Sequence, residues 1–242
     1  VVQRSQSRFS TNVAWLESRH CFSFGQHYDQ TNTHFGLLMV SNDDIVAPGA
    51  GFDTHPHRDM EIVTWVLSGS LVHQDSQGNN GVIYPGLAQR MSAGRGILHS
   101  EKNDSWRLTG TPEHCDPVHF IQMWVLPDTP GINPGYQQLD INDQLDSTGL
   151  AVVASGLAEH SHTTAIHIAQ SRAGLLAGRL APGERQGLPT APRLHLFVAV
   201  GAVELESGER LEAGDSARMS ESGGIAVTAG SAGAEILVWQ MH

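Results

Sequence analysis

An internal repeat is the feature that most limits how this chain can fold. GLAQRMSAGRGILHSE at 86–101 aligns without gaps on GDSARMSESGGIAVTA at 214–229, with Gly, Arg, Met, Ser, Gly and Ile at the same places. Two further pairs of segments match in the same order, 63–72 with 195–204 and 120–125 with 235–240. Three matches in one order are typical of a duplicated structural unit. The 242 residues suffice for two domains of ordinary size, and we predict domains at 1–130 and 131–242.

The segments between the turns are short and alternate in polarity. Because 26 Gly and 11 Pro interrupt the chain and few stretches carry helical periodicity, we expect strands rather than helices. The predicted strands are 35–40, 61–67, 70–75, 87–92, 118–126, 175–181, 195–200, 202–206 and 234–241. The polar stretch 127–144 is expected to be a loop. Many short strands at these intervals predict an all-β fold, with one sandwich or barrel in each repeat.

Charge and composition exclude several kinds of partner. With 14 Lys and Arg against 25 Asp and Glu, the net charge is -11 and no basic cluster is present, so direct binding to nucleic acid is not expected. No uncharged apolar run approaches the ~20 residues that a membrane helix needs, and the first residues lack a signal-peptide core. Cys21 and Cys115 are too few for a disulfide framework, which fits a reducing compartment. We therefore expect a cytoplasmic protein that binds no membrane.

Two pairs of residues with metal-ligand side chains stand in the first repeat. GFDTHPHRD contains His55 and His57, and GRGILHSE contains His99 and Glu101, each pair separated by one residue. Side chains at i and i+2 of a strand point to the same face, so each pair can point into one barrel. Pro56 points the other way and suits an edge or a strand entry. If the two strands are neighbours, three imidazoles and one carboxylate converge, and this set suits Fe, Ni, Co, Mn, Cu or Zn.

The second repeat has lost these residues. The matching positions are Gly187, Pro189, Val227 and Ala229, whose side chains offer no metal ligand. We therefore predict one metal site, in the first domain, which the fold itself does not require.

Other histidines and carboxylates compete for these roles. Glu61 completes an HxHxxxE pattern, but we prefer Glu101 as the ligand because it shares a strand face with His99; Glu61 is expected to orient a ligand or to serve the strand. His160 and His162 form a second HxH pair in a polar stretch without a partner pair, so we do not expect them to bind metal. The remaining histidines are expected to be structural or exposed: His20, His27, His34, His73, His114, His119, His167, His195 and His242.

Several segments resemble the pirin family of the cupin superfamily, and in particular its bacterial members described as quercetinases. They are GAGFDTHPHRDMEIVTWVLSGSLVHQDSQGN, MSAGRGILHSE and VHFIQMWVLPDTPGINPGYQQ, with CFSFGQHYD near the start and LLAGRLAPGE in the second half. The resemblance implies two tandem antiparallel cupin barrels of the jelly-roll type. It implies one metal, held in the N-terminal barrel by His55, His57, His99 and Glu101, and a metal-free C-terminal barrel. Asp59 differs from the HPHRG sequence more usual in animal pirins and leaves the ligands unchanged.

The resemblance also implies an oxidoreductase. The expected reaction is cleavage of a flavonol such as quercetin at the 2,3-bond, with both atoms of O2 incorporated and carbon monoxide released. The expected cofactor is one divalent transition metal, with Fe(II) as first choice and Ni, Co, Mn, Cu or Zn as alternatives. Glu101 is the expected catalytic residue, as ligand and as general base. The alternatives are a non-catalytic, metal-dependent regulator that binds a protein partner, and a β protein acting on another small phenol.

Overall fold

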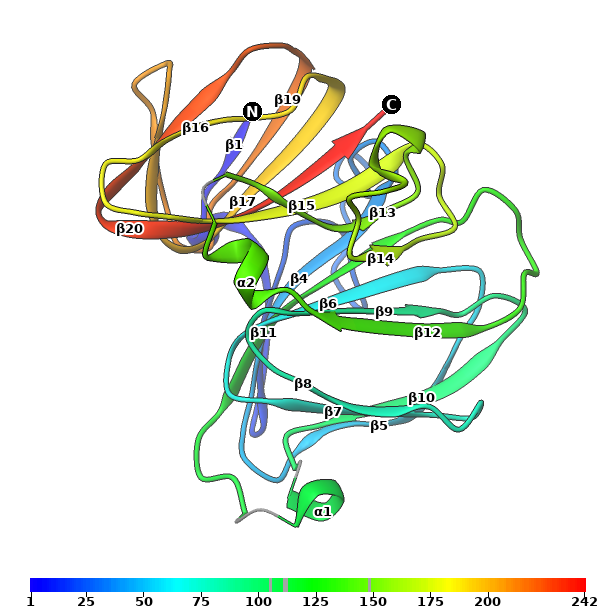
Figure 1. The fold of residues 1–242 in the computed structure, drawn as a ribbon. Coiled ribbons are helices and arrows are strands. Elements are labelled where there is room, and N and C mark those ends of the chain that lie inside the picture. Colours follow the sequence, from blue (N-terminus) through cyan, green and yellow to red (C-terminus); the bar gives the residue numbers. More distant parts are fainter. Residues whose placement is uncertain (105, 111–112, 148) are drawn as a thin grey trace.

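Two β units, one for each repeat, lie against each other in the computed structural model of this chain (Figure 1). The structure describes every residue except 105, 111–112 and 148. The predicted all-β class and its division into two β units are confirmed. Among the described residues, no helix is long and apolar enough to cross a membrane.

The N-terminal unit consists of two antiparallel sheets. The larger sheet runs in the order β12 (Gly135–Asp140), β9 (Leu87–Ser92), β6 (Glu61–Ser68), β11 (Val118–Val125), β4 (Leu38–Val46), β3 (Leu16–His20) and β2 (Phe9–Val13). The smaller sheet runs in the order β5 (Gly51–His57), β10 (Ile97–Lys102), β7 (Leu71–Asp75) and β8 (Asn80–Ile83). Figure 1 shows the smaller sheet below β9 and β12, so the two sheets enclose the interior of this unit.

One large sheet forms the C-terminal unit. Its order is β1 (Val2–Gln3), β19 (Ser216–Ser222), β17 (Ala191–Leu205), β20 (Ala226–Met241), β15 (Ala173–Leu180), β13 (Ala151–Ser155) and β14 (Ile166–His167); β16 (Arg185–Gly187) pairs with β20, and β18 (Arg210–Glu212) with β17. The strands predicted at 195–200 and 202–206 are one strand, β17, because register shifts along its pairing with β20 bend it without ending it.

Helices are few and short in the described residues. They are η1 (Ser5–Ser7), α1 (Trp106–Thr109), α2 (Asn142–Leu145) and η2 (Ala158–His160). The expected loop at 127–144 is wrong in part, because it contains β12 and most of α2. β12 is an edge strand that leaves its side chains half-buried or exposed, so its sequence GYQQLD carries no apolar alternation to reveal it.

Strand pairing confirms the repeat. In the N-terminal unit β6 lies between β9 and β11, and in the C-terminal unit β17 lies in the same way between β19 and β20. β5 pairs with β10 in the first unit, and β16 pairs with the start of β20 in the second. Two strands join the sheet of the other half of the chain. β12 follows residue 130 but pairs with β9 of the N-terminal unit, and β1, at the start of the chain, pairs with β19 of the C-terminal unit. The predicted division at 130/131 therefore separates β12 from the sheet that it joins.

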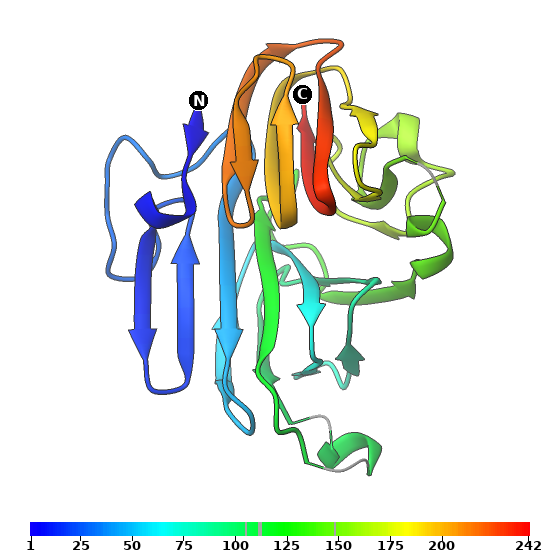
Figure 2. The same ribbon diagram turned by 90° about the vertical axis from the view of Figure 1, so that its left-hand side faces the viewer.

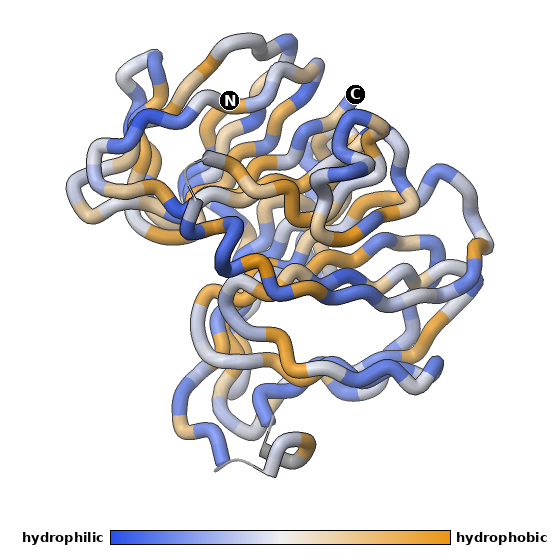
Figure 3. Tube along the Cα trace, viewed as in Figure 1, coloured by the Kyte–Doolittle hydropathy of each residue, from blue (hydrophilic) through white to orange (hydrophobic). Residues whose placement is uncertain are grey.

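Side chains of β6 and β11 point alternately to the interface between the two units and into the N-terminal barrel. Trp65 and Met123 point to the C-terminal sheet, where Trp65 donates to Glu235 at 2.7 Å and the indole nitrogen of Trp239 lies 3.2 Å from the sulfur of Met123. Their neighbours in sequence point the opposite way, into the N-terminal barrel. Figure 3 shows the resulting alternation of hydrophobic and hydrophilic residues along the strands of both units.

Seen from the side, β2 and β3 form a hairpin that extends the larger sheet beyond β4 (Figure 2). This hairpin forms one wall of the cavity described below.

Candidate metal centre and its cavity

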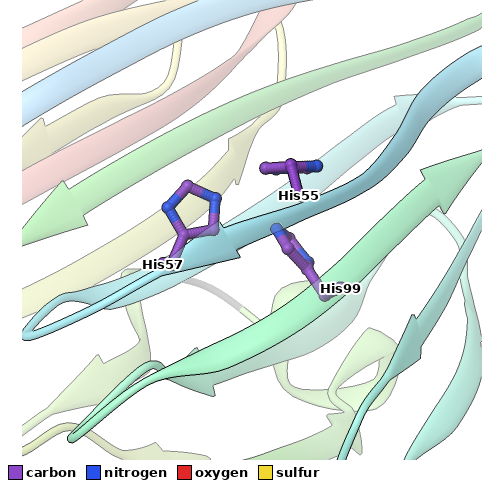
Figure 4. A group of neighbouring side chains, drawn as sticks. All are labelled: His55, His57 and His99. Carbon is purple, nitrogen blue, oxygen red and sulfur yellow. The ribbon is translucent and has the colours of Figure 1, made fainter.

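The two predicted ligand pairs lie on paired strands. β5 and β10 are antiparallel neighbours, and His99 is directly opposite His55 in their register. The ring centroids of His55, His57 and His99 are 4.5 to 4.9 Å apart, and Figure 4 shows the three rings around one shared space. One ligand atom from each ring lies within 4.8 Å of the others, so this group could hold a metal ion. The first predicted pair and His99 therefore meet across two paired strands.

The ring nitrogens of this group are arranged as metal ligands require. Nδ1 of His55 lies 2.7 Å from the carbonyl oxygen of Asp53, so it donates there and leaves Nε2 as an acceptor. Nε2 of His57 and Nε2 of His99 are buried and have no hydrogen-bond partner among the described residues. A buried nitrogen without a partner is costly in a folded protein, and a metal ion would satisfy both. The residues present therefore fit a bound metal.

Both of these histidines stay neutral near pH 7. Burial, together with the neighbouring His99 and His55, lowers the pKa of His57 to about 4. Burial likewise lowers the pKa of His99 to about 3, with added contributions from His55 and His73. Only the neutral imidazole has a lone pair to offer, so the pocket keeps these side chains ready to bind a cation.

Glu101 lies in the same interior but within a second group. Its ligand atom lies within 4.8 Å of those of His73 and His99, whereas the group of three histidines does not include it. Gln122, on β11, donates from Nε2 to both carboxylate oxygens at 2.9 and 2.8 Å. Thr64, on β6, lies 3.5 Å from one of them. The carboxylate is therefore held toward the larger sheet, with only 2% of the residue exposed.

His73 is a site residue that the sequence analysis missed. It lies on β7 opposite Glu101, its Nε2 lies 3.2 Å from Asp75, and its Nδ1 lies 3.4 Å from Nδ1 of His99. If Nε2 donates to the carboxylate, Nδ1 accepts from His99, and Nε2 of His99 keeps its lone pair. His73, expected to be structural or exposed, is buried, and this chain of contacts would also fix the tautomer of a candidate ligand. The spacing of His73 and Asp75 by one residue was the available signal.

A cavity of about 650 Å³ opens beside the candidate metal group. His55, His57 and Glu101 border it from the smaller sheet, and Gln122 and Trp124 from the larger sheet. Phe24 stands edge-on to Trp124 at 5.6 Å between ring centroids, Trp124 stands edge-on to His57 at 4.8 Å, and Phe52 borders the cavity from β5. This volume is in the usual range for small-molecule sites.

A row of polar side chains crosses the larger sheet inside the barrel. Register pairs His20 with Asn42, Asn42 with Gln122, and Gln122 with Thr64. Nδ1 of His20 donates to Asn42 at 2.9 Å, and its Nε2 lies 3.0 Å from the hydroxyl of Thr11. His20 and His27, which were expected to be structural or exposed, line the cavity. The signal for this row was the polar sequence SND inside the apolar strand β4.

Glu61 does not belong to the metal group. It begins β6 on the face that meets the C-terminal unit, where it accepts from Ser92 at 2.9 Å and from the backbone nitrogen of Ala169 at 3.0 Å. The second of the two expected roles, a structural one, is therefore the role the structure shows. In η2 and the turn after it, His160 contacts Ser155 at 2.9 Å and His162 is exposed. Both metal-ligand groups of the described residues lie in the N-terminal unit.

Residues 2–125 match the family model described as Pirin, and residues 152–241 match one described as the quercetinase C-terminal cupin domain. The chain belongs to the pirin family. It is 54% identical over 241 residues to a Mycobacterium tuberculosis protein that bears the provisional name quercetin 2,3-dioxygenase, covering 100% of this pirin and 94% of that protein. It is 44% identical over 137 residues to the quercetin 2,3-dioxygenase of Escherichia coli K12, covering 57% of this pirin and 56% of that enzyme.

Solved pirin structures share the fold. The crystal structure of YhhW from Escherichia coli superimposes with a TM-score of 0.87 at 32% identity, covering 100% of this pirin and 97% of that chain. The structure of the bacterial pirin YhhW in complex with nickel(II) gives 0.86 at 31% identity, over 100% and 98% of the two chains. The family resemblance and the two-unit cupin architecture are therefore confirmed.

Proposed function

We propose that this pirin is a metal-dependent dioxygenase that cleaves a flavonol such as quercetin at its 2,3-bond, with O2 as co-substrate and carbon monoxide as a product. The observation that carries the proposal is the pair of buried, unpartnered Nε2 atoms on His57 and His99, next to a cavity with aromatic walls. Relatives named quercetin 2,3-dioxygenase support this reaction class.

We assign the ligand set as His55, His57, His99 and Glu101. Three neutral imidazoles and one carboxylate suit a divalent transition metal, and a nickel complex of a pirin relative supports this class of ion. We propose Fe(II) first, with Ni, Co, Mn, Cu or Zn as alternatives. When bound, such an ion supplies a Lewis acid that lowers the pKa of the flavonol 3-hydroxyl.

The side chains of the site then divide the remaining work. The Glu101 carboxylate accepts the proton of the 3-hydroxyl, while Gln122 keeps both of its oxygens oriented. Phe24, Phe52 and Trp124 hold a flat aromatic ligand and exclude water from the reacting ring. His73 and Asp53 hold the tautomers of two ligands.

The decisive experiment measures O2 consumption and loss of quercetin absorbance with protein loaded separately with Fe, Ni, Co, Mn or Cu. We expect turnover with at least one ion, release of carbon monoxide in equal amount, and no turnover by His57→Ala. Stoichiometric metal without turnover by any of these ions would reject the dioxygenase and favour the metal-dependent regulator.

We also propose a cytoplasmic location. Both cysteines are free, with Cys21 buried and Cys115 exposed, and an exposed thiol is better preserved in a reducing compartment.

A further inference from the structure

Two adjacent aspartates on β4 lie in opposite environments. Asp43 points away from the barrel interior and is paired with Arg8 at 2.7 Å and His119 at 2.6 Å. Asp44 points inward, lines the cavity and has no cationic partner among the described residues. The chain thus places an uncompensated carboxyl group in the wall of the proposed substrate site.

Only one oxygen of Asp44 is used by the protein. Oδ1 accepts a short hydrogen bond from the hydroxyl of Ser18 on the neighbouring strand β3. Oδ2 has no hydrogen-bond partner within the described part of the chain, although the residue is only 3% exposed. Because Asp44 lines the cavity, a ligand in the cavity can supply the hydrogen bond that this oxygen lacks.

The protonation state of this carboxyl suits a neutral ligand. Burial, helped by the nearby charges of Asp43 and Glu101 and opposed by the hydrogen bond from Ser18, raises the pKa of Asp44 to about 7. Burial also opposes ionisation of Asp43, but His119 and Arg8 outweigh it and lower that pKa. Near neutral pH Asp44 is thus available both as acceptor and as donor, which matches a hydroxyl group that can do either.

Asp44 also lies on the opposite sheet from the candidate metal ligands. It is on β4 of the larger sheet, whereas His55, His57 and His99 are on β5 and β10 of the smaller one. A flat ligand between the aromatic walls can therefore meet the metal group on one side and Asp44 on the other.

We propose that Asp44 is a specificity-determining residue whose free carboxyl oxygen hydrogen-bonds a hydroxyl group of the aromatic substrate, at the cavity wall opposite the metal group. The identity of the ligand as a hydroxylated aromatic compound rests on the proposed function. Asp44 selects hydroxylated rings over bare ones, because a bare ring would leave Oδ2 buried without a partner.

The test measures the binding of quercetin, and of flavone, which lacks the hydroxyl groups, to metal-loaded protein without oxygen. Quenching of tryptophan fluorescence reports the binding. Asp44→Leu removes both oxygens at similar volume and should weaken quercetin binding about tenfold or more, with flavone binding and metal content unchanged. Asp44→Asn keeps hydrogen-bonding groups, so its quercetin affinity should lie between those of the wild type and Asp44→Leu. Asp43→Asn alters the adjacent carboxyl group on the opposite face of the strand and should leave both affinities as in the wild type, with thermal unfolding reporting its fold.

The outcomes separate this inference from the proposed reaction. Quercetin affinity of Asp44→Leu within about twofold of wild type would overturn it, as would an equal loss for flavone, which would show that Asp44 only shapes the cavity. Wild-type protein that binds quercetin through Asp44 but consumes no O2 would support the hydroxyl contact while the dioxygenase fails. Wild-type protein that does not bind quercetin would overturn both.

Discussion

The side-chain amide of Gln122 lies 2.9 and 2.8 Å from the two carboxylate oxygens of Glu101, so one donor group spans both. Its own oxygen accepts from the indole nitrogen of Trp124 at 3.0 Å, which fixes the amide's orientation. The larger sheet therefore orients the carboxylate that the smaller sheet carries, and a cavity wall residue completes the arrangement.

Gln122→Leu should leave the fold in place but release Glu101 from this orientation. We expect the affinity for the metal, or turnover by loaded protein, to fall about 10- to 100-fold, as is usual for residues that orient ligands. The matched control is Thr64→Val, which removes only a contact of 3.5 Å and should change either quantity much less. Metal titration and quercetin turnover measure both variants, and equal effects in the two would contradict an orienting role for Gln122.

Glu101→Gln tests the carboxylate itself. The amide keeps the size of the side chain but has neither the charge to bind a cation nor the basicity to take a proton. We expect weaker metal binding and, at saturating metal, a loss of turnover of about 100-fold or more, since general-base catalysis contributes on this scale. Activity within a few-fold of wild type at full metal occupancy would reject the base role while leaving the histidine ligands unaffected.

Histidine variants distinguish ligands from the residue that orients them. His57→Ala and His99→Ala should abolish stoichiometric metal, because each removes one of the buried unpartnered nitrogens. His73→Phe removes the acceptor for Nδ1 of His99 together with the contact to Asp75, and should weaken metal binding about tenfold. His73→Gln, which offers an acceptor, should recover part of it. His162→Ala, at the exposed histidine of the second HxH pair, is the control. Elemental analysis after dialysis measures all of these, and unchanged metal in His57→Ala would refute the ligand assignment.

The local part of this site could be predicted from the sequence. His55 and His57, like His99 and Glu101, are two residues apart on one strand, and the geometry of a strand fixes their common face. The repeat predicted which half carries them, because the second copy has a glycine and a proline at the positions of the first pair.

The contacts made across strands could not be predicted in the same way. His73 meets His99 because β7 pairs with β10, and Gln122 meets Glu101 because two different sheets close around one interior. Such contacts depend on register and sheet closure, which alternation within one segment does not specify. Asp43 and Asp44 show most clearly what the sequence cannot predict. They are identical neighbours in sequence, but in the fold Asp43 forms an ion pair with Arg8 and Asp44 lines the cavity.

Asp44 should make the stability of the folded protein depend on pH. Its pKa is raised to about 7 in the folded chain, compared with about 3.9 for an unfolded Asp. Below about pH 4 both states hold the proton, so the contribution to stability is fully present; it is lost as the pH rises through about 7, because the unfolded chain ionises more readily.

The side chain of Asp44→Asn stays neutral at every pH. The stability of this variant should therefore rise relative to that of the wild type as the pH rises. We expect the difference in free energy of unfolding to shift by a few kcal/mol in favour of the variant between about pH 5 and about pH 8. Urea unfolding of both proteins at matched metal content measures this difference, and a gap that stays constant over that range would contradict the raised pKa.

Asp59 closes the turn that follows the first ligand pair in a left-handed conformation, with φ of 48°. This region costs a residue with a Cβ roughly 1–2 kcal/mol, which explains why glycine suits the position in the HPHRG form. Asp59 offsets the cost by accepting from the backbone nitrogen of Gly131 at 2.6 Å.

Asp59→Gly loses the hydrogen bond but also the strain, so its stability should stay within about 1 kcal/mol of wild type. Asp59→Ala keeps the strain and loses the bond, so it should be destabilised by about 1–2 kcal/mol, with metal content unchanged in both. Urea unfolding compares the pair, and an alanine variant as stable as the glycine variant would show that the backbone at residue 59 is not strained.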